Sequence, residues 1–431
     1  MITRQEYKAR RQLLASKLPS ASLALIAAAN ETIRNGDVNY RFRQDSNFYY
    51  LTGLNEPDAV LVIMAAPLTK SYLFNRPRNE KEERWTGKRL GQTDACAVLD
   101  LDAAYSLDEL PTKLPELCAH VNAIYYNNIS EYSPLQRMIF AALQHLQKIK
   151  PNNLSSIWDL TPILAEMRLF KSVAEINLLR QAAAISIAAH RRVMRYCQQA
   201  TNEFHLEAEF LYELQRHGCR NVAYDPIIAA GSNACVLHYT DNNQPLKSGD
   251  LILVDAGAEV ANYAADLTRT IPANGHFNKE QRAIYDLVLQ AQTAGINCIK
   301  PGVSWHSIQE TIVRILTEGL CELGLLTGNV AQLIVQEAYK LFYFHGSGHW
   351  LGLDVHDLGN YKINEKWRLL EPGMVLTVEP GLYISSAILG VDQRYANIGV
   401  RIEDDILVTQ DGYENLSAAL PKEIAEIEAL M

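Results

Sequence analysis

The chain has 431 residues, of which 48% are hydrophobic, and its formal net charge at pH 7 is −9. This length exceeds that of one ordinary domain, so we expect two domains, each with a substantial core. An acidic chain without a basic cluster is not typical of proteins whose main partner is nucleic acid.

The first 150 or so residues alternate short apolar runs with helical segments, a pattern typical of an α/β domain. The run SLALIAAA at 22–29 follows a long polar segment and is too short to span a bilayer. We therefore interpret it as the first buried strand and expect no membrane association. Further elements are predicted as strands at 59–66, 71–75 and 122–127 and as a helix at 133–149. The polar stretch KIKPNNLSS at 148–156 is interpreted as the start of an interdomain connection.

The seven cysteines are odd in number and widely spaced, and no CxxC pair occurs. This pattern argues against a zinc ribbon or a disulfide framework and fits reduced thiols. We therefore expect a cytoplasmic protein.

A long helix is predicted to open the second domain. Ser172 and Glu175 have the spacing of a capping box. Apolar residues then follow at helical spacing from Ile176 to Ile187. We therefore divide the chain into domains at 1–171 and 172–431.

Two helical segments of the second domain resemble each other. The segment FHLEAEFLYELQRHG at 204–218 aligns with WHSIQETIVRILTEG at 305–319, an offset of 101 residues. Each is predicted to be a helix that ends at its last glycine, Gly218 or Gly319.

Two later segments also match, in the same order. GDLILVDAG and GMVLTVEPG each carry an acid six residues after the first glycine, so that Asp255 and Glu379 are equivalent at an offset of 124. One such match arises easily by chance, but two in the same order favour a duplicated unit with pseudo-twofold symmetry.

Four acids end or open apolar strands in the two halves. Asp255 and Asp266 come from the first half, and Glu379 and Glu403 come from the second. For any one of them, a strand-end acid that faces water is the more common arrangement, although Asp and Glu are disfavoured in strands and rarely buried alone. Four together would repel one another unless cations lay between them, and two divalent ions would balance their charge.

A glycine-rich segment, FHGSGHWLGLDVHD at 344–357, carries His345, His349 and His356. A lone histidine is usually a surface or core residue, but three in so short a segment indicate a site. Oxygen ligands with one imidazole suit Mn²⁺, and also Co²⁺, Fe²⁺ or Zn²⁺. A pair of such ions is typical of metal-assisted hydrolysis.

The ordered set of Asp255, Asp266, His349, Glu379 and Glu403 resembles the five-ligand signature of the pita-bread metallopeptidases. HWLGLDVHD, LTVEPGLY and GVRIEDD are similar to the aminopeptidase P branch in particular, as are YRFRQDSNFYYLTGLNEPDAVLVI, WTGKRLGQ and EMRLFKS nearer the N-terminus. The resemblance covers nearly the whole chain. It implies an N-terminal creatinase-like α/β domain and a C-terminal pita-bread catalytic domain of the α+β type, in a homo-oligomer that is a dimer or a tetramer.

The resemblance also implies roles for the five ligands. Asp255 would hold one ion, and Asp266 and Glu403 would bridge two ions, manganese above all. His349 and Glu379 would hold the second ion, and Glu379 would also be the general base toward the attacking water.

Further residues match the substrate site of the family. His238 and His356 correspond to histidines that contact substrate and steady the tetrahedral intermediate, and His356 would help to move a proton to the leaving nitrogen. The remaining matches are His345, Tyr383, Arg401, Tyr224 and Trp85. Tyr224 and Trp85 could equally be core aromatics.

Several activities share this ligand set. The resemblance favours an aminopeptidase that removes the N-terminal residue of peptides with proline second, and a prolidase that splits Xaa-Pro dipeptides is the alternative. Methionine aminopeptidases lack the extra N-terminal domain, and creatinase-like hydrolases lack the metal ligands. A noncatalytic protein-binding module is disfavoured because all five ligands are present. The pair Trp350 and Leu351 is typical of the aminopeptidase P branch, which favours longer peptides over dipeptides.

Overall fold

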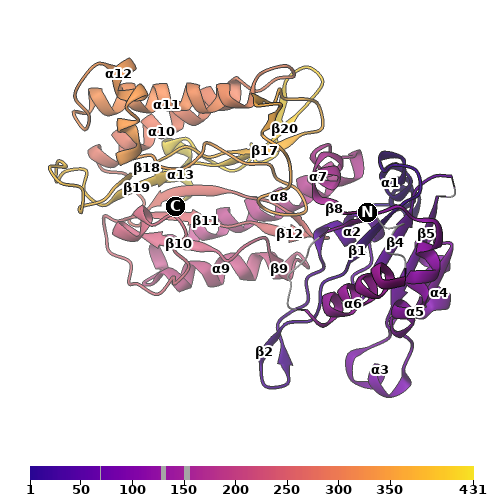
Figure 1. The fold of residues 1–431 in the computed structure, drawn as a ribbon. Helices are drawn as coiled ribbons and strands as arrows, with labels where there is room; N and C mark the ends of the chain where they lie inside the picture. Colours follow the sequence, from indigo (N-terminus) through magenta and orange to yellow (C-terminus); the bar gives the residue numbers. More distant parts are fainter. Residues whose placement is uncertain (68, 128–132, 150–155) are drawn as a thin grey trace. The chain divides into compact units, whose positions relative to one another are not determined.

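The computed structural model describes residues 1–67, 69–127, 133–149 and 156–431. It divides into two compact units, Met1–Arg168 and Leu169–Met431 (Figure 1). Each unit has its own hydrophobic core.

The first unit is built on a six-stranded mixed sheet. Its strands, in spatial order, are β6 (Ala103–Ser106), β5 (Lys70–Asn75), β4 (Val60–Met64), β1 (Ser22–Ala27), β7 (Ala123–Tyr126) and β8 (Ser156–Asp159). All six residues of β1 are buried. The strands predicted at 22–29, 59–66, 71–75 and 122–127 are therefore confirmed.

The helices of this unit include α6, which confirms the helix predicted at 133–149. They are α1 (Arg4–Lys17), α2 (Ser46–Thr52), α3 (Glu80–Thr86), α4 (Gly91–Leu99), α5 (Leu110–Leu117), α6 (Pro134–Ile149) and α7 (Thr161–Leu169). Two short 3₁₀ helices and a hairpin complete it: η1 (Leu107–Glu109), η2 (Cys118–His120), β2 (Ile33–Asn35) and β3 (Val38–Asn39).

The connection between the units comes later than the sequence suggested. Residues 150–155 of the predicted connection lie outside the described residues, but β8 directly follows them and pairs with β7 in parallel. The chain therefore returns to the first sheet, and the prediction of a connection beginning at 148–156 is wrong. A polar loop reveals that an element has ended, but its composition does not say to which sheet the next strand returns.

The second unit begins with the predicted helix. Ser172 caps α8 (Val173–Tyr196): its Oγ accepts from the Glu175 N–H at 3.3 Å, and the Glu175 carboxylate accepts from the Ser172 N–H at 2.8 Å. This confirms the capping box. The other helices are η3 (Cys197–Gln199), α9 (Glu203–Arg216), η4 (Gly231–Cys235), α10 (Lys279–Asn297), α11 (Trp305–Glu322), α12 (Val330–Val335), η5 (Ala338–Leu341) and α13 (Ile424–Leu430).

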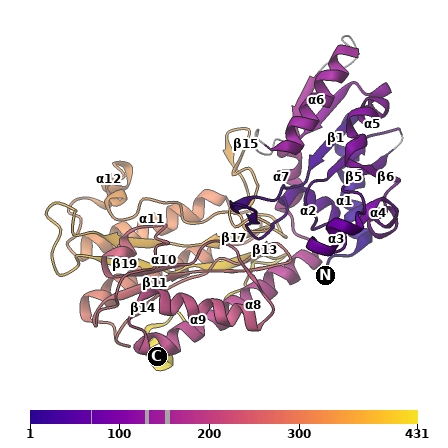
Figure 2. The ribbon, with the colours of Figure 1, turned by 90° about the horizontal axis from the view of Figure 1, so that it is seen from below.

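Small antiparallel sheets form the centre of this unit. The first half gives β10 (Ile227–Ala230), β11 (Leu251–Asp255) and β14 (Thr268–Pro272), and beside them β13 (Tyr263–Ala264), β12 (Ala258–Val260) and β9 (Asn221–Val222). The second half has an exposed hairpin of β15 (Lys362–Ile363) and β16 (Lys366–Trp367), and it gives to the centre β17 (Val375–Val378), β20 (Asp404–Val408), β21 (Tyr413–Asn415), β18 (Gly381–Ile384) and β19 (Ile398–Arg401). Helices α8 and α9 cover one face of these sheets and α10 and α11 cover the other (Figures 1 and 2).

The same backbone contact occurs in both halves. Asn202, before α9, forms an isolated bridge with Pro245, and Ser304, before α11, forms one with Leu369. The helix ends are 102 residues apart and the strand segments are 124 residues apart. The strand offset equals the offset of 124 residues found in the sequence. The helix offset exceeds the offset of 101 residues found there by one residue. The internal duplication predicted from the sequence is therefore confirmed.

The prediction that Gly319 ends a helix is wrong. Gly218 follows α9 with a φ of +77°, as a terminating glycine should, but α11 continues through Gly319 to Glu322. A Cβ on Gly319 would lie 2.3 Å from Cδ1 of Leu287 on α10. Glycine is used here for close helix packing and not for its backbone freedom.

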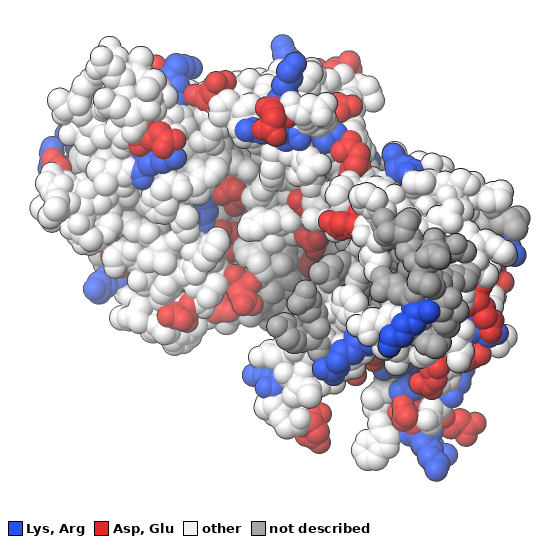
Figure 3. All heavy atoms as spheres, viewed as in Figure 1, with Lys and Arg blue, Asp and Glu red and all other residues white. Residues whose placement is uncertain are grey.

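The face drawn in Figure 3 carries charges of both signs. Lysine and arginine are interspersed with aspartate and glutamate over the described part of the face in Figure 3. Within the described ranges, no helix is long and apolar enough to cross a bilayer.

Candidate active site

A cavity of about 400 Å³ opens in the second unit. All five predicted metal ligands line it, together with the predicted substrate residues His238, His345, His356 and Arg401. The segments that carry them are separated by as many as 165 residues in the sequence, and the sheets of the two halves bring them together.

The acids reach the cavity from strand ends. Asp255 is the last residue of β11 and pairs with Thr268, the first residue of β14, two positions after Asp266. Glu379 directly follows β17, and Glu403 lies between β19 and β20. An isolated bridge between Thr268 and Glu403 joins the two halves at this point. The strand ends of the duplicated unit therefore converge on one place.

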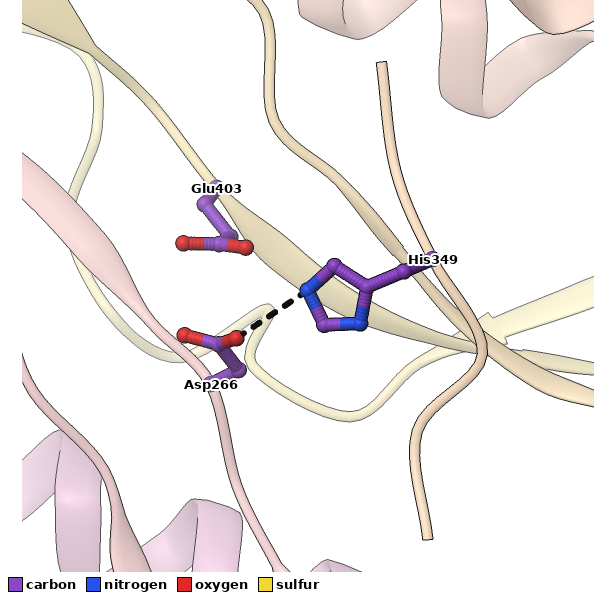
Figure 4. A group of neighbouring side chains, drawn as sticks. All are labelled: Asp266, His349 and Glu403. Atoms are coloured by element: carbon purple, nitrogen blue, oxygen red, sulfur yellow. Dashed lines mark ion pairs between the residues drawn. The ribbon is translucent and has the colours of Figure 1, made fainter. Parts of the chain in front are cut away.

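Three of the ligands form a compact group. One donor atom from each of Asp266, His349 and Glu403 lies within 4.8 Å of the other two, and Figure 4 shows the three side chains pointing toward one another. Nε2 of His349 is 3.3 Å from Oδ2 of Asp266. Nδ1 of His349 is 3.0 Å from the carbonyl oxygen of Trp350, to which it donates a hydrogen bond. This bond leaves Nε2 as the ligand atom that faces the acids.

The other two acids lie at the edges of this group. Oε1 of Glu379 is 3.6 Å from Nε2 of His349. Asp255 forms an ion pair with Arg401 and accepts a hydrogen bond from the Tyr224 hydroxyl at 2.6 Å. The same hydroxyl is 2.5 Å from Oδ1 of Asp266.

The pKa values of most acids in the cavity are raised, which indicates too little positive charge to balance their carboxylates. Burial raises the pKa of Glu403 well above its ordinary value, and the neighbouring carboxylates raise it further. Burial likewise raises the pKa of Glu379 to about 7 and raises the pKa of Asp255. Burial lowers the pKa of His349, but the hydrogen bond to Asp266 and the charge of Glu379 outweigh this and raise the pKa to about 9.

These properties fit divalent cations. The donors are carboxylate oxygens and one imidazole nitrogen with a fixed tautomer, which suit metals such as manganese, cobalt, iron and zinc. Among the described residues that line the cavity, Arg401 is the one arginine, against four carboxylates of which three are buried and Glu379 is half-buried. Bound cations would supply the positive charge needed to balance these carboxylates.

Three further histidines surround the donors. His238 and His356 are exposed to solvent, and the ring centroid of His356 lies 4.4 Å from that of His349. His345 donates from Nδ1 to the carbonyl oxygen of Gly346 at 2.8 Å, and its Nε2 accepts from the Tyr383 hydroxyl at 2.8 Å. Burial and, to a smaller extent, the charge of Arg401 lower the pKa of His345 to about 3.

The predicted tyrosines and tryptophan lie in different places. Tyr383 is fully buried and accepts from Nη1 of Arg401 at 3.0 Å. Tyr224 bonds two of the acids, so it is more than a core aromatic. Trp85 lies on α3 in the first unit with 90% of its surface exposed, so it is not a core residue.

Several residues at the site were not predicted. Leu237 and Tyr361 line the cavity, and no periodicity marks them because both lie in irregular segments. Thr268 Oγ1 donates to Oε2 of Glu403 at 2.6 Å. Its position two residues after Asp266 could have revealed it, because alternate residues of a strand share a face.

Comparisons with known proteins show the family of the chain. The model of metallopeptidase family M24 matches residues 177–410, and the model of the aminopeptidase P N-terminal domain matches residues 7–125. The chain therefore belongs to metallopeptidase family M24. Its pita-bread catalytic domain and N-terminal domain place it in the aminopeptidase P branch, and it is a metallo-aminopeptidase.

Relatives and solved structures match the whole chain. Xaa-Pro aminopeptidase of Escherichia coli is 45% identical over 435 residues, covering 100% of this chain and 98% of the relative. Human Xaa-Pro aminopeptidase 3 is 32% identical, covering 100% and 86%. Aminopeptidase P of E. coli with the inhibitor Pro-Leu has a TM-score of 0.95 at 44% identity and covers 100% of this chain and 98% of the relative. Proline aminopeptidase P II of Yersinia pestis has a TM-score of 0.95 at 46% identity, covering 100% and 99%.

Proposed function

We propose that this protein is a Xaa-Pro aminopeptidase, which hydrolyses the bond between an N-terminal residue and a penultimate proline. The observation that carries the proposal is the complete set of five donors around one cavity, in a chain 45% identical over its full length to a protein named for this activity. A protein-binding module would have no need to keep three buried acids and the half-buried Glu379 around one cavity.

We propose that two divalent cations, manganese in the cell, bind here. Asp255 would hold one cation, Asp266 and Glu403 would contact both, and His349 and Glu379 would hold the other. Once bound, the cations would polarise the scissile carbonyl and make the attacking water more acidic. A structure of zinc-substituted E. coli aminopeptidase P in complex with product supports a divalent metal site of this chemistry.

The side chains around the donors would move the proton. Glu379 would accept a proton from the attacking water as general base. His356 and His238 are exposed and line the cavity, where they would hydrogen-bond the developing oxyanion, and His356 would help to pass the proton to the proline nitrogen. Arg401, bound to Asp255 and Tyr383, would keep these two residues in place.

Substrate contacts, assembly and location are part of the same proposal. Tyr224, His345, Tyr383, Arg401 and Trp85 would shape substrate binding. We propose a cytoplasmic homo-oligomer with domains at 1–171 and 172–431. Sedimentation of the purified protein would measure the oligomeric state, and a monomer at micromolar concentration would contradict it.

Substrate length separates the two leading activities. A prolidase must bind the free carboxylate of its dipeptide and close the far end of the cleft, whereas an aminopeptidase must leave that end open. We therefore expect the manganese-loaded protein to cut Xaa-Pro-Xaa tripeptides with higher kcat/KM than Xaa-Pro dipeptides.

The controls vary the second residue and the length of the peptide. Xaa-Ala-Xaa peptides should lose most of the turnover, because the pocket for proline would be left unfilled. Preference for dipeptides with refusal of tripeptides would identify a prolidase. A metal-loaded protein that cuts none of these peptides would favour the noncatalytic module.

A further inference from the structure

The loop from His349 to Asp357 carries two of the histidines at the cavity. His356 faces the ring of His349 and is exposed to solvent. Among the described residues, the His356 ring has no hydrogen-bond or ion-pair partner. No hydrogen bond between the ring and a described residue therefore holds His356 in position. Its position depends on the backbone of the loop, and above all on the next residue, Asp357.

Asp357 closes this loop and is anchored from inside the unit. Its backbone N–H donates to the carbonyl oxygen of Trp350 at 2.9 Å, and its Oδ1 accepts from the Asp354 N–H at 3.5 Å. Its Oδ2 is 3.1 Å from Nζ of Lys171, and each of these two side chains is only 1% exposed. The ion pair thus ties the closed loop to the segment that leads into α8.

The remainder of the loop leaves room for this ion pair. A Cβ on Gly352 would lie 2.2 Å from Oδ2 of Asp357 and 3.0 Å from Cε of Lys171. The carbonyl oxygen of Gly352 accepts from the Ala264 N–H at 2.8 Å, so the loop is also tied to β13. Glycine at this position lets the loop pass directly over the two charges.

Stability alone does not explain a fully buried ion pair, because the desolvation of two charges offsets most of their attraction. A pair of apolar side chains would fill the same space. Unlike apolar side chains, an ion pair fixes the orientation of Asp357, because its carboxylate must point at one atom, Nζ of Lys171. We propose that Lys171 and Asp357 are positioning residues that hold His356 in place beside His349. The inference rests on the proposed role of His356 in hydrolysis.

The test removes both charges together, so that neither is left buried alone. The double variant Lys171→Met/Asp357→Asn is compared with His356→Ala and with the variant that combines all three changes. We expect the double variant to lose about 10- to 100-fold in kcat, because a small misplacement of a catalytic group is costly. Its metal content should stay that of the wild type, and KM should change less than about threefold.

Coupling to His356 is the decisive readout. His356→Ala should lower kcat by about 10²- to 10⁴-fold, and the combined variant should be no more than about threefold slower than His356→Ala. A milder variant, Lys171→Arg alone, keeps both charges buried together but moves the donor atoms, for the case that the double variant does not fold. It should show a smaller loss that also vanishes in the His356→Ala background.

A matched control uses an exposed ion pair of the same unit, Arg180 and Glu414, whose side chains are 44% and 38% exposed. Arg180→Met/Glu414→Gln should keep the wild-type kcat. A double variant with wild-type kcat, or one that costs the same factor with and without His356, would overturn the inference while His356 keeps its role. A His356→Ala protein with wild-type turnover would refute the proposed role of His356 itself and would overturn the inference with it.

Discussion

The hydroxyl of Thr268 should set the affinity of the site for metal. Thr268 is fully buried, and its Oγ1 donates to Oε2 of Glu403 at 2.6 Å and accepts from Nε of Arg401 at 3.2 Å. Thr268→Val keeps the branched shape but removes the hydroxyl. Thr268→Ser keeps the hydroxyl and removes only a methyl group.

The expected effect follows from these two hydrogen bonds. A hydrogen bond to a charged group is worth about 1.5–3 kcal/mol, and a buried group that loses its partner bears most of that cost. Valine leaves one oxygen of Glu403 and one N–H of Arg401 without this partner. Since 1.4 kcal/mol is a factor of ten, we expect Thr268→Val to bind metal about 10- to 150-fold more weakly. Loss of a hydrogen bond to a metal ligand typically costs 10- to 100-fold in affinity.

The affinity is measured by competition between the metal-free protein and a chelating dye for Mn²⁺. Thr268→Ser should bind within about threefold of the wild type, and thermal melting should show that both variants are folded. Wild-type affinity in Thr268→Val would refute the reasoning. Equal weakening in both variants would show that the methyl group, and not the hydroxyl, matters.

Three further results are expected. Treatment with a chelator should abolish hydrolysis and Mn²⁺ should restore it, with elemental analysis finding two ions per chain; activity in a protein without stoichiometric metal would contradict the site. Glu379→Gln should lower kcat by about 10²- to 10⁴-fold with a much smaller change in KM, and a loss confined to KM would exclude Glu379 as the base. Burial raises the pKa of Asp404, but the charges of Arg269 and Lys422 outweigh it and hold that pKa below its usual range. Its contribution to stability is therefore present above the unfolded pKa of about 3.9 and is lost as the pH falls further. The urea midpoint should drop more steeply below about pH 4 in the wild type than in Asp404→Asn, and parallel curves would contradict this.

Much of the fold was predictable from local sequence patterns. The start of α8 was predictable because Ser172 and Glu175 satisfy each other within one turn. The strand at 22–29 was predictable because all six residues of β1 are buried, which requires an unbroken apolar run. The convergence of Asp255 and Glu379 was predictable because a repeated segment implies a repeated place in the fold.

Features that depend on packing between distant residues were not predictable. Gly319 has the sequence context of a helix end, but its missing side chain admits Leu287 from another helix. The return of β8 to the first sheet depends on hydrogen bonds to β7. Tyr361 reaches the cavity from an irregular segment and stacks on Trp350, with ring centroids 5.5 Å apart. The spacing of residues in the sequence does not predict which of these distant elements and side chains come into contact.

The duplication explains where the acids lie, but the chemistry depends on where the halves differ. In the first half, Ala230 of β10 pairs with Ile252 of β11. At the equivalent place in the second half Trp350 pairs with Leu376, which lies 124 residues after Ile252. His349 therefore occupies the place that Ala229 has in the first half. An ancestral pair of identical halves would have offered two equivalent sets of carboxylates, with no distinction between them. The histidine makes one side of the cavity chemically different from the other, because it gives the second half an imidazole donor beside its carboxylates at a place where the first half has only Ala229.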